Sequence, residues 1–135
     1  MPEDSMKDPR HARTLLRVTV ALLLFIHGAY RLLVHGVPDF GGFLASKGFP
    51  FGVALAGAIT AFELAGGTLL AWGRLVRPVA CGFMANLLAG ILLVHGREGW
   101  FVVGGGRNGV EYSVLLIACL ASLCLGEAQA AAPQG

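Results

Sequence analysis

Three ionisable side chains lie deep inside long apolar stretches of the sequence, namely His27, Arg31 and Glu63. An ionisable group in a bilayer is costly, so it usually faces the interior of a helix bundle and marks a functional site. A carboxylate and an imidazole in a low dielectric can exchange protons near neutral pH, and an arginine can stabilise an anion. These three residues are therefore the candidate catalytic residues.

Three more ionisable residues stand near the ends of apolar stretches, and we take His35, His95 and Glu111 as candidate ligand-binding residues. His27, Arg31 and His35 recur every four residues, so on a helix they form a single stripe. The antiparallel order of successive spans brings His35, His95 and Glu111 to the same, outer half of a bundle. The sequence thus predicts a polar site in that half.

Small residues follow Glu63, because the chain continues Leu64-Ala65-Gly66-Gly67. Such residues let a neighbouring helix approach closely, so we expect Glu63 to pair with Arg31 or with His27. Asn86 lies in the third apolar stretch, and we interpret it as an interhelical hydrogen bonder. Its nine-residue separation from His95 predicts that these two residues face opposite ways and cannot both line one site.

Two readings compete with catalysis for these groups. The buried pairs could be structural staples that fix the order of the helices, and Arg31 could extend to the outer headgroups. A metal site is a further alternative, in which His35, His95 and Glu111 meet at the outer rim or His27 joins a haem-ligand pair. No spacing of the H-E-x-x-H kind supports it, so we predict no metal.

The composition is that of a membrane protein. Of 135 residues, 56% are hydrophobic and 13% are charged, with a mean hydropathy of +0.71, whereas soluble domains carry about a quarter charged residues. Four apolar segments take up so much of the chain that no separate soluble catalytic domain fits. The net charge of +2 comes from basic residues spread along the sequence, which excludes a nucleic-acid-binding patch.

The apolar segments predict an all-α fold, a polytopic four-helix bundle with spans at about 16–35, 52–72, 76–95 and 110–126. Residues 1–13 form a polar N-terminal tail, 14–126 the membrane domain and 127–135 an Ala-rich tail. In the 36–51 connection, Asp39 resembles a helix N-cap, and Gly48 and Pro50 are stop signals. We expect a short amphipathic helix there, lying in the first outer loop.

An even number of spans places both termini on one side, and the basic residues decide which side. Six lie on the side of the termini and four on the other; they are Lys7, Arg10, Arg13, Arg17, Arg74 and Arg77 against Arg31, Lys47, Arg97 and Arg107. The positive-inside rule then predicts cytoplasmic N- and C-termini in a plasma or inner membrane.

The three cysteines, Cys81, Cys119 and Cys124, lie within apolar runs and form no C-x-x-C motif. We expect them to be small packing residues in helices. The alternative is a pairing of Cys81 with Cys124 near one membrane face.

Several motifs in order resemble the DoxX family over about residues 14–126: His27-Gly28-x-x-Arg31, Phe43-Leu44-x-x-x-Gly48-x-Pro50, Glu63-x-x-Gly66-Gly67, Val94-His95-x-x-x-Gly99-Trp100-Phe101 and Gly109-Val110-Glu111. The resemblance implies a four-helix membrane protein with cytoplasmic termini and a link to membrane redox chemistry, including thiosulfate:quinone oxidoreductase and oxidative-stress complexes. The ending after the fourth helix departs from many relatives, which puts a partner that binds there in doubt.

The functional hypotheses are three. A quinone-linked or accessory subunit would hold a bound quinone, with His27 and Glu63 at its headgroup and Arg31 stabilising an anionic intermediate. Because no electron-carrying cofactor is encoded, a soluble or membrane redox partner would supply electrons. A non-catalytic scaffold that recruits soluble redox enzymes is the alternative, and a small-solute or proton pathway ranks third. The lipid bilayer is the one certain partner, and the sequence does not give the oligomeric state.

Overall fold

The computed structural model describes residues 8–131 and 133. Its elements are the helices α2 (Pro9–Leu33), α3 (Val37–Ser46), α4 (Gly52–Trp72), α5 (Val76–Leu93) and α6 (Glu111–Ala131), with a short 3-10 helix, η1 (His95–Arg97), after α5. The described residues contain no strand. α2, α4, α5 and α6 are long and apolar enough to cross a membrane, which confirms the predicted all-α polytopic bundle.

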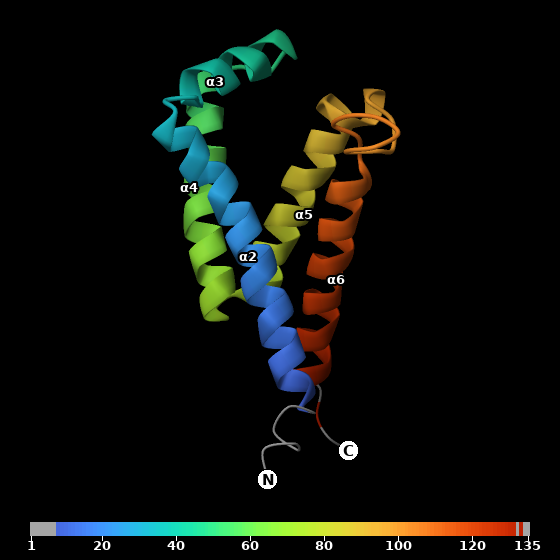
Figure 1. Cartoon of the computed structure of the whole chain (residues 1–135). Helices are drawn as coiled ribbons and strands as arrows, with labels where there is room; N and C mark the ends of the chain where they lie inside the picture. Colours follow the sequence, from blue (N-terminus) through green and yellow to red (C-terminus); the bar gives the residue numbers. More distant parts are fainter. Residues whose placement is uncertain (1–7, 132, 134–135) are drawn as a thin grey trace.

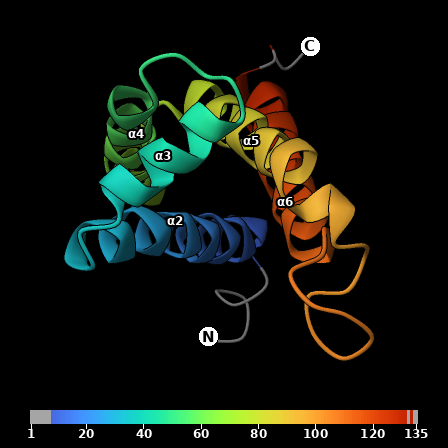
Figure 2. The ribbon, with the colours of Figure 1, turned by 90° about the horizontal axis from the view of Figure 1, so that it is seen from above.

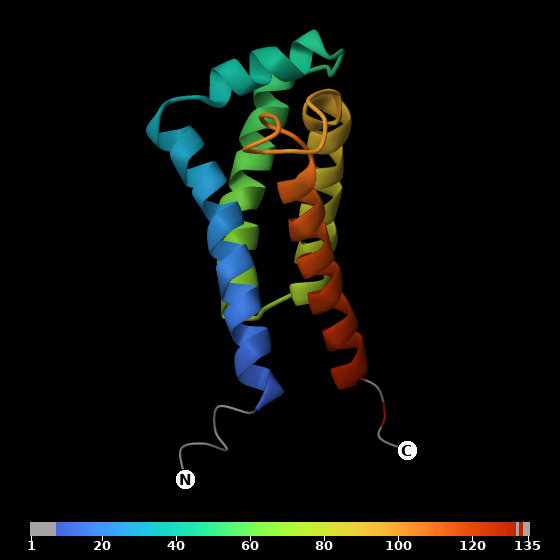
Figure 3. The same ribbon diagram turned by 45° about the vertical axis from the view of Figure 1, so that its right-hand side comes forward.

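The helices form two antiparallel pairs (Figure 1). α2 packs along α4, with α3 lying across the start of α4, and α5 packs along α6, while contacts between the pairs are fewer. α2 begins and α6 ends at one end of the bundle, which we call the termini end, and α3 lies at the opposite α3 end. Seen from above and from the side, the pairs separate towards the α3 end (Figures 2 and 3).

The apolar core fills the half of the bundle at the termini end. Its largest fully buried side chains are Leu70, Phe83, Leu120 and Leu123, which come from the end of α4, the first half of α5 and the middle of α6. Outward-facing positions such as Leu92 carry large exposed apolar side chains. This pattern suits a bundle whose outer surface contacts the bilayer lipid.

Helix α2 begins at Pro9, earlier than the predicted span, because Asp8 caps it. The Asp8 carboxylate accepts the backbone N–H of Arg10 at 2.9 Å, and proline is well suited to the first turn. Part of the predicted N-terminal tail is therefore helical, while residues 1–7 of that tail lie outside the described residues. Helix α6 likewise continues past residue 126 to Ala131.

The predicted helix in the first outer loop is present as α3, but the predicted N-cap is wrong. Gly36 occupies the N-cap position and Asp39 lies inside the first turn, where a carboxylate faces the positive end of the helix dipole. Proline at position 38 can start a helix, which explains the earlier beginning. Gly48, with a φ of 90°, follows the end of α3, in agreement with its predicted role as a stop signal.

Close glycine contacts hold the first pair together. A Cβ on Gly67 would lie 2.9 Å from the Cβ of Phe25 on α2, and one on Gly28 would lie 3.0 Å from the Cβ of Glu63 on α4. Gly52 likewise meets the Gly41 carbonyl of α3. The absence of side chains at these positions allows α2 and α3 to approach α4, which brings Arg31 within reach of Glu63.

Candidate functional site

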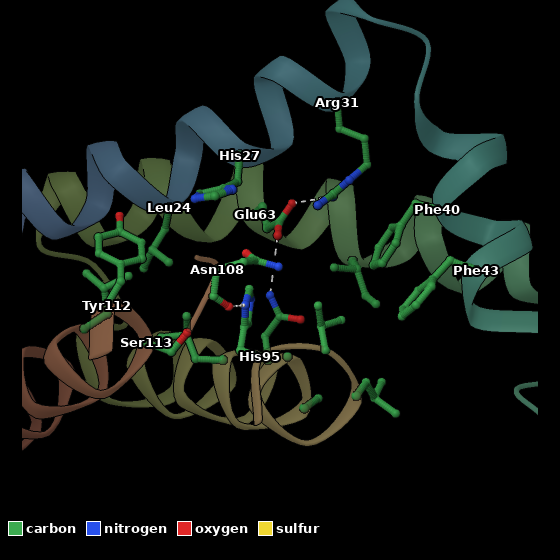
Figure 4. A pocket seen from close by; sticks show the side chains of 18 of the residues that line it. Leu24, His27, Arg31, Phe40, Phe43, Glu63, His95, Asn108, Tyr112 and Ser113 are labelled. Carbon is green, nitrogen blue, oxygen red and sulfur yellow. Dashed lines mark hydrogen bonds and ion pairs between the residues drawn. The ribbon is translucent and has the colours of Figure 1, made fainter. Parts of the chain in front are cut away.

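A cavity of about 350 Å³ lies between the two helix pairs in the half of the bundle towards α3 (Figure 4). α2 and α4 line one side, α5, η1 and the first turns of α6 line the other, and α3 and the loop before α6 contribute near the α3 end. Leu24 and Leu116 belong both to the cavity wall and to the core. The cavity therefore begins where the packed core ends.

An ion pair joins α2 to α4 at the cavity wall. Arg31 Nη1 donates to Glu63 Oε2 at 2.6 Å and to Thr60 Oγ1 at 2.9 Å, and the Glu63 side chain is only 7% exposed. Thr60 in turn donates to the Ala56 carbonyl. Of the two predicted pairings of Glu63, the structure forms the one with Arg31.

Asn86 extends this polar cluster to the second helix pair, because its Nδ2 donates to Glu63 Oε1 at 3.4 Å. The prediction that Asn86 is an interhelical hydrogen bonder is thus confirmed. The prediction that Asn86 and His95 cannot line one site is wrong, since both line the cavity. The helical projection fails because α5 ends at Leu93 and the chain then turns into η1.

Arg31 uses only part of its donor capacity on the described residues, because its hydrogen bonds to them all start from Nη1. Its guanidinium carbon lies 4.4 Å from the centre of the Phe40 ring, a stacking distance that favours a cation. The N–H groups on Nε and Nη2 therefore remain able to bind a further acceptor at the cavity wall.

Two histidines line the cavity from opposite helix pairs. His27 lies one turn before Arg31 on α2, and in the part of the chain that the structure describes its ring makes no hydrogen bond. His95 Nδ1 lies 2.8 Å from the Asn108 carbonyl oxygen. Because a carbonyl only accepts, Nδ1 carries the proton, and in the neutral ring Nε2 is an acceptor.

Two of the candidate ligand-binding residues do not line the cavity. α2 ends at Leu33 and His35 adopts a left-handed conformation with a φ of 54°, which takes it off the stripe predicted with His27 and Arg31. The Glu111 carboxylate accepts the Val102 N–H at 3.0 Å and so holds the loop before α6. Among residues 8–131 and 133, no three His, Cys, Asp or Glu side chains gather as a metal site would require.

The structure adds polar and aromatic residues that the sequence argument did not select. Thr60 accepts a hydrogen bond from Arg31. Tyr112 and Ser113 of α6 line the cavity, together with Phe40 and Phe43 from α3. Thr60 precedes Glu63 by three residues, so helical spacing could have identified it. Tyr112 and Ser113 carried no such signal, because their position depends on how α6 faces α2.

The family model described as DoxX matches residues 12–96. This range contains α2 from its fourth residue, α3, α4, α5 and the start of η1, and it includes His27, Arg31, Glu63, Asn86 and His95. Neither the curated proteins nor the solved structures contain a match to this chain.

Proposed function

The chain belongs to the DoxX family of membrane proteins, and from the cavity that it carries we propose that it is a quinone-binding accessory subunit of a membrane redox system. The observation that carries the proposal is the composition of the cavity wall. Apolar side chains surround a small group of convergent polar residues, as is typical of sites for small amphipathic molecules. The cavity volume of about 350 Å³ is in the range of such sites, roughly 300–1,000 Å³.

A quinone headgroup matches this wall because it is a flat apolar ring with two carbonyl oxygens. The unbonded His27 ring would donate a hydrogen bond to one oxygen, and the free guanidinium N–H groups of Arg31 would stabilise negative charge that develops on the other. Glu63 holds Arg31 in place through the 2.6 Å ion pair. The apolar tail of the quinone would remain in lipid beside the bundle.

Reduction of a quinone to a quinol takes up two electrons and two protons. In our proposal a partner redox protein, soluble or membrane-bound, supplies the electrons, and His27 passes protons to the headgroup oxygens because an imidazole ring can both take up and give up a proton. Glu63 keeps the site close to neutral by balancing Arg31. The six-to-four distribution of basic residues favours cytoplasmic termini in a plasma or inner membrane, and with that orientation the cavity would open towards the opposite face.

Substitution of His27 by glutamine tests the proposal. Glutamine can donate and accept hydrogen bonds but cannot titrate near neutral pH. The full chain, purified in mild detergent, is titrated with decyl-ubiquinone while intrinsic fluorescence is followed, and membranes are assayed for quinone reduction. We expect His27→Gln to fold and to bind the quinone, with affinity lowered by less than about tenfold, a difference of about 1.4 kcal/mol, but to lose quinone-dependent activity.

His35→Gln is the matched control, because His35 follows shortly after the end of α2 and does not line the cavity. It should leave binding and activity unchanged. Full activity of a folded His27→Gln protein would remove His27 from the chemistry. No saturable binding of decyl-ubiquinone by the unsubstituted protein would contradict the quinone proposal and favour a non-catalytic scaffold.

A further inference from the structure

Two of the three cysteines lie against each other across the contact between α5 and α6. The Cys124 thiol on α6 donates to the Arg77 carbonyl of α5 at a sulfur–oxygen distance of 3.9 Å. Within an α-helix that carbonyl also accepts the N–H of the residue four positions later, which is Cys81. This shared carbonyl places Cys124 beside Cys81 at the α5–α6 contact, and both cysteines are free thiols.

The two thiols differ in access. Cys81 is exposed on the outer surface of the bundle, whereas Cys124 is half-buried and packs against the apolar core. Cys81 lies one helical turn from Arg77, which stands near the start of α5 at the termini end. A small reagent at that membrane face can therefore reach Cys81 more readily than Cys124.

We propose that Cys81 and Cys124 form a thiol–disulfide exchange site, separate from the cavity, whose substrate is a low-molecular-weight disulfide. The Cys81 thiolate attacks one sulfur of the substrate, breaks its S–S bond and forms a mixed disulfide, while the first leaving thiolate takes up the proton that Cys81 lost. The Cys124 thiolate then attacks the Cys81 sulfur and releases the second thiolate, which takes the second proton. The protein is oxidised by two electrons and the substrate is reduced to two thiols.

The cavity and the dithiol lie at different heights of the bundle. Cys81 is five residues before Asn86 on α5, or about 7.5 Å of helix rise, and it is not among the cavity-lining residues. Oxidation would link α5 to α6 covalently at the termini end. The dithiol therefore acts independently of whether the cavity holds a quinone.

Dipyridyl disulfide provides the test, because each exchange step releases a coloured pyridinethione. The full-length Cys119→Ser protein in detergent retains only Cys81 and Cys124. We expect it to release two pyridinethiones per chain and to end with a mass lower by two hydrogen atoms and no pyridyl adduct. If it instead carries pyridyl adducts on its cysteines, or does not react, the exchange site is disproved.

The Cys124→Ser protein is the matched control, since it also has two cysteines, Cys81 and Cys119, but lacks the facing pair. It should retain a stable pyridyl adduct on Cys81 and form no internal disulfide. Where Cys119→Ser lowers expression, Cys119→Ala replaces it. An internal disulfide formed as fast in the Cys124→Ser protein would show that the pairing is not specific, which also overturns the proposal.

Discussion

The two ends of the bundle both hold half-buried arginines, but these arginines are bound in different ways. At the termini end, Arg17 on α2 donates from Nη1 to the carbonyls of Leu70 and Ala71 at 2.7 and 2.6 Å. Those carbonyls are at the C-terminal end of α4, where the last turn carries partial negative charge and its carbonyls have few backbone partners; the Leu70 carbonyl also accepts the Gly73 N–H. Arg13 likewise joins α2 to α6 through Glu127 at 2.6 Å.

At the α3 end, Arg31 binds the carboxylate of Glu63 rather than a helix end, and a cavity lies beside it. The packed core stops at Leu24 and Leu116, so towards α5 and α6 this ion pair meets Asn86 and the cavity rather than the core. An arginine in such a bundle is therefore structural when it completes a helix terminus. It is a site candidate when its spare donors face unfilled volume.

The largest expected effect concerns the side of the membrane that each end of the bundle faces. Four spans and the six-to-four distribution of basic residues predict that a reporter active only in the cytoplasm gives signal at both termini and at Gly73, and none within residues 39–47. The contrast should be all or none. Signal at one terminus alone would contradict the four-span bundle, and signal only within 39–47 would place the cavity towards the cytoplasm.

The second prediction concerns the ion pair between Arg31 and Glu63 at the α3 end. Glu63→Ala leaves the Arg31 charge without its partner between the helices, and we expect a loss of about 3 kcal/mol of unfolding free energy in detergent. Arg31→Ala should cost a similar amount, because it leaves the Glu63 carboxylate without a cation and with only the 3.4 Å hydrogen bond from Asn86. The double variant should cost less than the sum by at least about 1 kcal/mol. Additive losses would show that the two residues do not stabilise each other.

The lengths of the apolar segments predicted the membrane spans, but they did not predict the residues at which the helices end. The predicted pairing of Glu63 with a basic residue of the first span followed from helical spacing and from the glycines beside Glu63. His35 left its predicted stripe because α2 ends at Leu33 and Gly36, the N-cap of α3, follows immediately after His35. His95 entered the cavity because α5 ends before it.

Residues that depend on tertiary packing could not be found from local patterns. Asn108 reaches the cavity through a loop that is held by the Glu111 carboxylate and by backbone bonds such as that from the Gly109 N–H to the Phe101 carbonyl. Tyr112 faces α2 only because α6 packs antiparallel to α5. Periodicity describes one helix at a time, whereas these contacts depend on how two pairs of helices diverge.

The smallest expected effect separates the two kinds of arginine directly. Arg17→Gln keeps a hydrogen-bond donor near the end of α4 but removes the charge, so it weakens two charge-assisted bonds to Leu70 and Ala71. We expect a loss of about 1–2 kcal/mol of unfolding free energy and an unchanged affinity for decyl-ubiquinone. Arg31→Gln should reduce that affinity, because its spare donors line the cavity.

Arg10→Gln is the control for the general effect of removing a positive charge from α2. The Arg10 side chain is 90% exposed, and an exposed pair contributes little to stability, so thermal unfolding should not change. If Arg17→Gln weakens quinone binding as much as Arg31→Gln does, the termini end is coupled to the cavity. The division of the bundle into a structural end and a ligand-binding end would then be wrong, because weaker helix contacts at the termini end would lower the quinone affinity at the α3 end.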